Sequence, residues 1–198
     1  MTSGMSLACT GGTGTFGRAL IARLVAAGAS RLVVLSRDEW KQARLAERYP
    51  EPSPLRYCLG DVRDRDRLEV AFAGCETVVH AAALKRVDAV AYNPEEVVKT
   101  NILGTINVIR AAADAGVSRV VLLSSDKAVR PANIYGASKM MAEHYAIAAN
   151  AYTVPRGCAV TVVRYGNVLG SRGSVVHTWR RCAAAGRPAP LTDPDATR

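Results

Sequence analysis

Short apolar runs alternate with longer amphipathic segments along this chain, and the alternation predicts its elements. The apolar runs are largely continuous, which is typical of strands covered by helices on both faces. Strands are predicted over residues 6–10, 31–36, 54–59, 77–81, 119–124 and 159–164. Helices are predicted over residues 15–27, 39–49, 65–73, 95–115, 134–152 and 175–185.

This order of elements predicts an α/β fold. Repeated strand–helix–strand units build a parallel sheet by right-handed crossovers, with helices on both faces. With a dinucleotide motif in the first turn, the expected architecture is a Rossmann-like doubly wound sheet of strand order 3-2-1-4-5-6. We expect residues 1–186 to form this domain. Residues 187–198 would be a short tail, the start of a truncated or missing substrate-binding region.

Length and composition exclude several classes of protein. A chain of 198 residues needs no disulfide or metal to fold. Its 49% apolar and 22% charged residues are ordinary globular composition, which excludes disordered and fibrous proteins. The longest apolar runs reach about eight residues, whereas a spanning helix needs about 20. No signal peptide or membrane span is predicted.

Cysteine and histidine usage predicts reduced thiols and no metal site. The five cysteines are odd in number, and none forms a CxxC pair. The three histidines lie far apart in the sequence. Reduced thiols are typical of a cytoplasmic protein.

The net charge of +9 favours an anionic partner. A basic domain can bind nucleic acid, but no run of five Lys or Arg occurs here. The densest stretch, residues 63–67, alternates in sign and predicts a solvated helix start. An arginine-rich proteome is one explanation of the charge and a small anionic ligand is the other, and the motifs decide between them; no nucleic acid is expected.

A glycine-rich turn follows the first predicted strand. Gly11, Gly14 and Gly17 are spaced GxxGxxG between a strand and an amphipathic helix. The first permits a tight turn, the second lets a pyrophosphate approach backbone N–H groups, and the third allows close packing. A purely structural turn is the alternative. The predicted cofactor-binding residues here are Thr10, Gly11, Gly14, Thr15, Phe16 and Gly17.

The ends of the second and third strands bear on cofactor choice. Arg37, with Arg18 nearby, can accommodate a 2′-phosphate, which favours NADP; Asp38 leaves NAD as the alternative. Asp61 is placed to reach the adenine; a cap of the next helix is the alternative role, and the two are compatible. The cofactor-binding residues predicted at these ends are Ser36, Arg37, Asp38, Asp61 and Val62.

The fourth strand ends in small residues that let a cofactor approach closely. His80 is interpreted as a packed core histidine rather than a catalyst. Four of the five lysines lie near the ends of strands four and five, which favours specific roles for them. The predicted cofactor-binding residues here are Ala81, Ala82, Ala83 and Lys85.

Ser125, Tyr135 and Lys139 form the candidate catalytic group. Ser125 ends strand five, and Tyr135 and Lys139 share one helix face because they are four residues apart. The Lys139 ammonium is expected to hold the nicotinamide ribose and to lower the pKa of Tyr135. A tyrosinate would then remove a hydroxyl proton while hydride leaves for the nicotinamide.

These motifs together resemble the extended short-chain dehydrogenase/reductases, which hold NAD(P) and act on nucleotide sugars. Further segments resemble the inverting UDP-N-acetylglucosamine 4,6-dehydratases of polysaccharide biosynthesis. These segments cover residues 36–39, 60–64, 80–85, 92–94, 100–101, 125–127, 135–139 and 164–174. The Asp126-Lys127 pair is the most diagnostic of them, although a surface ion pair is the alternative reading.

The resemblance implies a mechanism. Tyr135 would take the proton of the sugar 4-OH as hydride leaves C4 for NADP⁺. Lys127 would remove the acidified C5 proton and Asp126 would protonate the departing 6-OH, after which hydride returns to C6. Reprotonation of C5 from the opposite face would invert that centre. Ser125 stands where the family commonly has Thr, and its hydroxyl is expected to bind substrate.

The resemblance also implies binding residues and partners. Asn101 would join the cofactor site, and the substrate-binding residues would be Lys85, Asn167, Ser171, Arg172 and Arg198. A homo-oligomer is expected, paired through helices 95–115 and 134–152. Family members are longer, so two alternatives remain. One is an NADP-dependent epimerase or dehydrogenase of a smaller nucleotide or nucleoside, and the other is a non-catalytic NADP-binding module.

Overall fold

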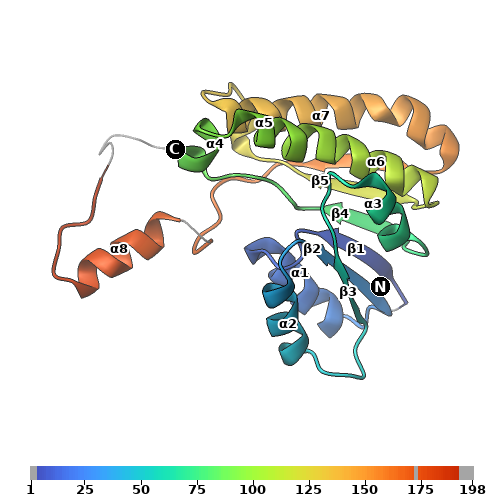
Figure 1. Cartoon of the computed structure of the whole chain (residues 1–198), viewed down its shortest axis with the longest axis horizontal. Coiled ribbons are helices and arrows are strands. Elements are labelled where there is room, and N and C mark those ends of the chain that lie inside the picture. The colour runs from blue at the N-terminus through green and yellow to red at the C-terminus, as the bar shows by residue number, and fades with distance from the viewer. Residues whose placement is uncertain (1–3, 172–173, 192–198) are drawn as a thin grey trace. The chain divides into compact units, whose positions relative to one another are not determined.

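The computed structural model describes residues 4–171 and 174–191. It divides into two compact units, Met1–Gly166 and Asn167–Arg198. The first unit holds a six-stranded parallel sheet of order β3-β2-β1-β4-β5-β6 (Figure 1). The predicted fold class and strand order are therefore confirmed. The strands are β1 (Ser6–Thr10), β2 (Arg31–Ser36), β3 (Leu55–Leu59), β4 (Thr77–His80), β5 (Arg119–Leu123) and β6 (Ala159–Val163).

Helices cover both faces of this sheet, with α1 and α2 on one face and α3, α6 and α7 on the other (Figure 1). The longer helices are α1 (Thr15–Ala26), α2 (Glu39–Arg48), α3 (Arg65–Phe72), α6 (Gly104–Asp114), α7 (Ile134–Thr153) and α8 (Val175–Ala184). Shorter segments are α4 (Val87–Ala91), α5 (Pro94–Val97), a π-helix η1 (Val98–Leu103), and two 3₁₀ turns, η2 (Asp126–Ala128) and η3 (Val154–Arg156).

The core splits into two layers because neighbouring strand residues face opposite sides of the sheet. In β1, Ala8 packs in the layer beneath α3, α6 and α7, whereas Leu7 and Cys9 pack in the layer beneath α1 and α2. Ile21 and Phe72 are among the largest fully buried side chains of the two layers. Both layers being filled explains why the strand sequences are continuous apolar runs.

Residues 95–115 differ from the single helix that the sequence predicts. The segment begins as α5 with Pro94 in its first turn, continues as the π-helix η1, and becomes α6 only at Gly104. A Cβ at Gly104 would lie 2.7 Å from Val62 Cγ2, so this glycine allows close packing. The π-helix carries Asn101, whose side chain is buried with 1% exposure.

The second unit contains α8 and its flanking segments. His177 Nε2 lies 3.0 Å from the carbonyl oxygen of Gly170, and Trp179 Nε1 donates a 3.0 Å hydrogen bond to the carbonyl oxygen of Pro190. The proposed domain boundary at residues 186–187 stays a prediction. None of the helices formed by the described residues is long and apolar enough to span a bilayer.

Candidate active site

The glycine-rich turn between β1 and α1 is built by close backbone approaches. Gly11 has φ +68°, and a Cβ there would lie 2.9 Å from the backbone nitrogen of Ala82. A Cβ at Gly17 would overlap the carbonyl oxygen of Gly12. Helix α1 begins with Gly14 as its N-cap and has no acidic residue in its first turn. This arrangement suits the approach of a pyrophosphate to backbone N–H groups.

His80 lies beneath this turn and is part of the core, as predicted. Its Nδ1 lies 2.7 Å from Thr10 Oγ1 and its Nε2 lies 3.1 Å from Thr105 Oγ1. Thr105 donates its own proton to the carbonyl oxygen of Asn101, so its oxygen accepts from Nε2. Burial, and then the nearby Lys139 cation, lower the pKa of His80 to about 3. The ring is therefore neutral, which suits a structural role.

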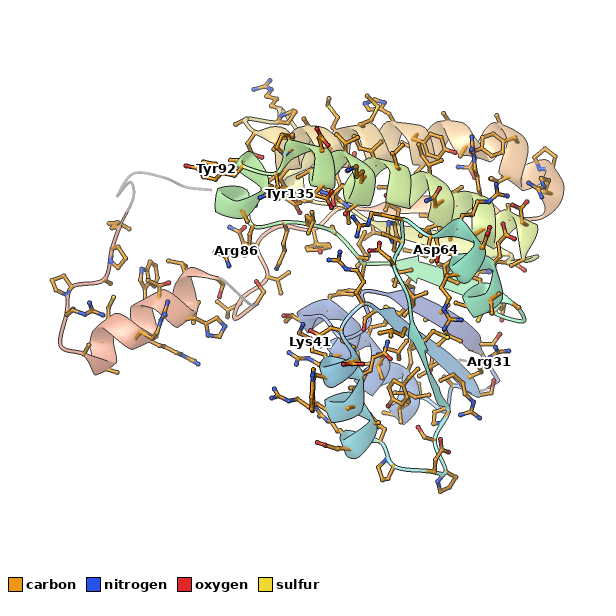
Figure 2. All side chains as sticks on the ribbon, in the orientation of Figure 1. Arg31, Lys41, Asp64, Arg86, Tyr92 and Tyr135 are labelled. Carbon is orange, nitrogen blue, oxygen red and sulfur yellow. The ribbon has the colours of Figure 1, made fainter. Side chains whose placement is uncertain are left out.

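Asp61 lies among arginines at the end of β3. Its carboxylate accepts hydrogen bonds from Arg63 at 2.8 and 3.0 Å and lies 3.5 Å from Arg37 Nη1. Burial acts to raise the pKa of Asp61, but hydrogen bonds from Arg63 outweigh it and hold the pKa below its usual value. The alternative role of Asp61 as a helix cap is wrong. Asp64 caps α3 instead, since its Oδ1 accepts the backbone N–H of Arg67 at 3.0 Å (Figure 2).

The residues predicted to select the cofactor, Arg37 and Asp38, lie at the end of β2 and differ in their contacts and exposure. Asp38 caps α2 through the backbone N–H of Lys41 and also pairs with the Lys41 ammonium. Ser36 is buried and accepts a hydrogen bond from Gln42 at 3.2 Å. The side chain of Arg37 is 54% exposed. The cation is thus the more accessible of the two charged groups after β2.

Asn101 clamps the segment that follows β4. Its Oδ1 accepts the backbone N–H of Leu84 at 2.8 Å, and its Nδ2 donates to the Leu84 carbonyl at 2.9 Å and to Ser138 Oγ at 3.0 Å. The amide therefore ties this segment to α7. Ala81, Ala82 and Ala83 are half-buried, Val62 is buried and Lys85 is exposed.

Ser125, Asp126 and Lys127 form a connected group directly after β5. Ser125 Oγ donates to Asp126 Oδ1 at 2.9 Å, and Lys127 Nζ lies 3.0 Å from the same oxygen. The hydrogen bond from Lys127 is the main reason that the pKa of Asp126 lies below its usual value. The ground state is therefore an ion pair. Ser125 is 6% exposed, so its hydroxyl is held in place by burial.

The start of α7 places Tyr135, labelled in Figure 2, within hydrogen-bond reach of Ser125. Asn133 caps the helix by accepting the backbone N–H of Gly136 at 3.0 Å. A Cβ at Gly136 would overlap the carbonyl oxygen of Lys127, so this glycine lets α7 begin against residues 125–127. Lys139 lies one turn further along and is 4% exposed; its Nζ donates to the carbonyl oxygen of Leu123 at 2.6 Å.

The pKa of Tyr135 corrects one expectation. Burial raises it, the nearby Tyr165 and Asp126 raise it further, and only a hydrogen bond with Ser125 lowers it, so that the net direction is upward. The expected lowering by Lys139 is not what this structure has, because the ammonium is directed at the Leu123 carbonyl. The phenol is therefore neutral in this arrangement.

Three further residues in this region, Glu143, Arg164 and Tyr165, are not among the predicted site residues. Tyr165 follows β6 and stacks on Phe16, with ring centroids 6.4 Å apart and planes 7° from parallel. Glu143 continues the four-residue spacing of Tyr135 and Lys139 along α7, and it binds Arg164. That spacing could have identified Glu143, and the position of Tyr165 directly after a strand could have identified the ring.

The predicted substrate-binding residues are divided between the two units of the chain. Lys85 belongs to the first unit, whereas Asn167 and Ser171 belong to the second. Arg172 and Arg198 lie outside the described residues. Their role in binding a substrate stays a prediction.

The comparison with known proteins decides the family. Residues 7–198 match the family described as "Polysaccharide biosynthesis protein". The chain belongs to this family. It is 42% identical over 200 residues to a UDP-N-acetylglucosamine 4,6-dehydratase (inverting) of Campylobacter jejuni, covering 100% of this chain and 60% of that protein. The resemblance inferred from the motifs is confirmed.

Other similar proteins have different activities in their names. A UDP-glucose 4-epimerase of Rickettsia conorii is 39% identical, with 98% of this chain and 58% of that protein covered. The solved structure of DesIV, a dTDP-glucose 4,6-dehydratase from Streptomyces venezuelae with NAD and TYD bound, superposes with a TM-score of 0.79 at 26% identity. That match covers 94% of this chain and 64% of DesIV. The chain spans about three fifths of the length of these curated family relatives.

Proposed function

We propose that this chain carries the cofactor site and the acid–base groups of an NADP-dependent nucleotide-sugar 4,6-dehydratase. The observation that carries the proposal is the Asp126–Lys127 pair, which lies 3.0 Å apart between Ser125 and the start of α7. Elimination of water needs an acid and a base in addition to the group that accepts the hydroxyl proton. The substrate class is UDP-N-acetylglucosamine or a related nucleotide sugar, in line with the Campylobacter relative.

The residues present fit a nicotinamide dinucleotide. The turn at Gly11, Gly14 and Gly17 has the close backbone approaches that a pyrophosphate cradle needs. Arg37, half-exposed after β2, would pair with a 2′-phosphate, and this supports NADP. DesIV binds NAD, which remains the alternative cofactor. The bound cofactor would accept a hydride from the substrate and return it later.

Tyr135 would take the substrate's hydroxyl proton. Its pKa lies above the usual value because the ring is buried, so a partner must stabilise the phenolate as it forms. Ser125 supplies one hydrogen bond for this purpose, and Lys139 is one helical turn away. Tyr135 must first release its own proton to solvent, because the resting phenol is neutral; the proton of the sugar hydroxyl then passes to the phenolate oxygen, which Ser125 holds by a hydrogen bond.

Asp126 and Lys127 would exchange a proton before they act. The dehydratase needs a neutral amine as base and a protonated carboxyl as acid, whereas the resting pair is ionised. Transfer of one proton along the 3.0 Å N–H···O hydrogen bond converts the ion pair into the neutral pair, and both groups then have the required form. A bound sugar would exclude solvent water from the pair, and this favours the neutral form because neutral groups lose less solvation free energy than charged groups do.

Product analysis tests the proposal. With UDP-N-acetylglucosamine and NADP, we expect a product lighter by one water and no net consumption of cofactor, measured by mass spectrometry and absorbance. Asp126→Asn and Lys127→Met should block water loss but still allow hydride transfer, so that reduced cofactor accumulates. The matched control is Lys99→Met, which removes a surface lysine paired with Glu96 at 3.3 Å. Normal dehydration by both site variants would refute the acid–base assignment.

A second candidate function is 4-epimerisation, which the 39% identity to the Rickettsia epimerase favours. An epimerase returns hydride to C4 and releases an isomer of unchanged mass, and it does not need the Asp126–Lys127 pair. The same mass spectrum separates the two activities. We further propose a cytoplasmic homo-oligomer; Met141 and Ile147 on α7, 53% and 63% exposed, supply apolar surface for pairing.

A further inference from the structure

We propose that Glu143, held by Arg164, is a positioning residue that keeps the buried Lys139 ammonium charged and directed at the end of β5. This inference rests on the proposed function, together with the expectation from the sequence that Lys139 holds the cofactor ribose and assists Tyr135. Glu143 occupies the next position on the same face of α7, four residues beyond Lys139. The group would act through Lys139 rather than touch the substrate.

Glu143 is a buried carboxylate with a defined partner. Its side chain is 3% exposed, although it lies on a helix that has a solvent-facing side. Arg164, directly after β6, donates from Nε to both carboxylate oxygens at 2.9 and 3.0 Å, and from Nη2 to Oε2 at 2.6 Å. Burial acts to raise the pKa of Glu143, but the hydrogen bonds from Arg164 hold it below its usual value. The carboxylate is therefore ionised inside the protein.

The buried ammonium of Lys139 needs a nearby negative charge to stay protonated. It is 4% exposed, and burying an ammonium without a counter-charge is costly. Burial lowers its pKa to about 8, and Glu143 opposes this by favouring the charged form. His80 of β4 lies close enough for its pKa to respond to Lys139, and it is neutral. Tyr135, one turn earlier on α7, has a raised pKa and is also neutral, and the Arg164 cation is bound to Glu143. Among these four groups, His80, Tyr135, Arg164 and Glu143, Glu143 alone is negative.

The contact with Arg164 explains why Glu143 does not form a direct ion pair with Lys139. Within the described part of the chain, Lys139 and Glu143 form no direct ion pair, and Lys139 donates to the Leu123 carbonyl instead. The guanidinium occupies both carboxylate oxygens and fixes their position. Its own charge is 55% exposed and is screened by water, so the field of the buried carboxylate still reaches Lys139. The ammonium thus stays charged and available to a ligand.

A purely structural brace is the competing explanation. The pair joins α7 to the segment after β6, and its loss could simply loosen these two elements. The two explanations differ at Lys139. A brace predicts an unchanged Lys139 titration in any variant that folds, whereas a positioning role predicts a shift.

The test is a pH titration of the lysine side chains by NMR on the full chain. Its five lysines make the spectrum simple, and Lys139→Met identifies the signal. Glu143→Gln should lower the pKa of Lys139 by about one unit, which is a tenfold loss of the charged form on the alkaline side. Glu143→Asp should restore most of it. The matched control is Asp114→Asn, which removes another carboxylate bound by arginines, Arg65 and Arg156.

A double variant covers the case in which Glu143→Gln does not fold. Glu143→Met with Arg164→Met removes both charges and leaves neither group unpaired. The proposal expects the same fall of the Lys139 pKa in this folded protein. An unchanged Lys139 titration in either folded variant overturns it.

Turnover supplies a second readout. The alkaline limb of the kcat profile should move to lower pH by about one unit in Glu143→Gln, with KM for the sugar little changed. The NMR titration needs no substrate, so it decides the role of Glu143 even if no nucleotide sugar is dehydrated. Failure of the proposed function would appear in the product analysis alone.

Discussion

The two halves of the sheet edge are built differently. At the ends of β1 and β4 the cradle is made of backbone, with glycines where a side chain would collide with main-chain atoms, and with a neutral buried histidine beneath it. At the ends of β5 and β6 the site is made of charges, in the Asp126–Lys127 pair, the buried Lys139, and Glu143 with Arg164.

The difference teaches which properties each half can have. A backbone cradle recognises a ligand by shape and by N–H groups, so its binding should depend little on pH. The charged half holds groups whose charge depends on pH, and burying such groups lowers the stability of the fold. Buried groups with shifted pKa values are typical of functional sites. Variants in the two halves should therefore fail in different ways.

The largest expected effect is the loss of turnover in Tyr135→Phe. Under the proposed function, removing the hydroxyl removes the group that would accept the substrate proton, and we expect turnover to fall by about 10³-fold. Cofactor affinity should change less than about twofold, because the glycine cradle is untouched. Steady-state rates and calorimetry measure the two quantities, with Tyr152→Phe as a control on the exposed side of the same helix. A variant that lost cofactor and turnover together would contradict the separation of the halves.

Gly17→Ala should show the opposite pattern. Its added methyl group would overlap the Gly12 carbonyl, which cannot move without the whole turn, and we expect a loss of about 3 kcal/mol in unfolding free energy. Cofactor affinity should fall with it. Denaturant titration and calorimetry measure these effects. Gly166→Ala is the control, since a Cβ there would meet no atom of the described residues within 4 Å. Unchanged stability and binding in Gly17→Ala would remove the basis for a backbone-built cradle.

Acid should destabilise the protein through His80. Its pKa is about 3 in the folded chain against 6.5 in an unfolded one, so the unfolded state binds the extra proton between these values. The contribution of His80 to the unfolding free energy is fully present above pH 6.5 and decreases as pH falls, by about 2 kcal/mol at pH 5. Urea titrations at several pH values, compared between the native chain and His80→Gln, measure the difference. Equal acid sensitivity in both proteins would show that His80 is not the source.

The smallest expected effect concerns Arg37→Ala. Loss of one half-exposed cation should weaken NADP binding by about tenfold and leave NAD binding unchanged. Calorimetry with both cofactors tests this, and Arg44→Ala on the exposed side of α2 is the control. Equal affinity of the unmodified chain for NADP and NAD would remove the case for Arg37 as the selective group.

The sequence alone determined the fold, and it predicted where the candidate site lies. Continuous apolar runs predicted strands buried on both faces, and the glycine spacing predicted the turn after β1, because both depend on local geometry. The tyrosine and lysine of α7 were also predicted, since helical spacing places residues four apart on one face. These features need no knowledge of which distant segments meet.

Only the tertiary structure decided which charged groups contact one another at the ends of β5 and β6 and in which direction their pKa values shift. The contact of Glu143 with Arg164 joins residues 21 positions apart, and the direction of the Tyr135 pKa depends on burial, on Ser125 and on Tyr165. The π-helix that brings Asn101 to Leu84 likewise follows from no local pattern in the sequence. Burial and long-range contacts set these properties, and periodicity along the chain carries information about neither.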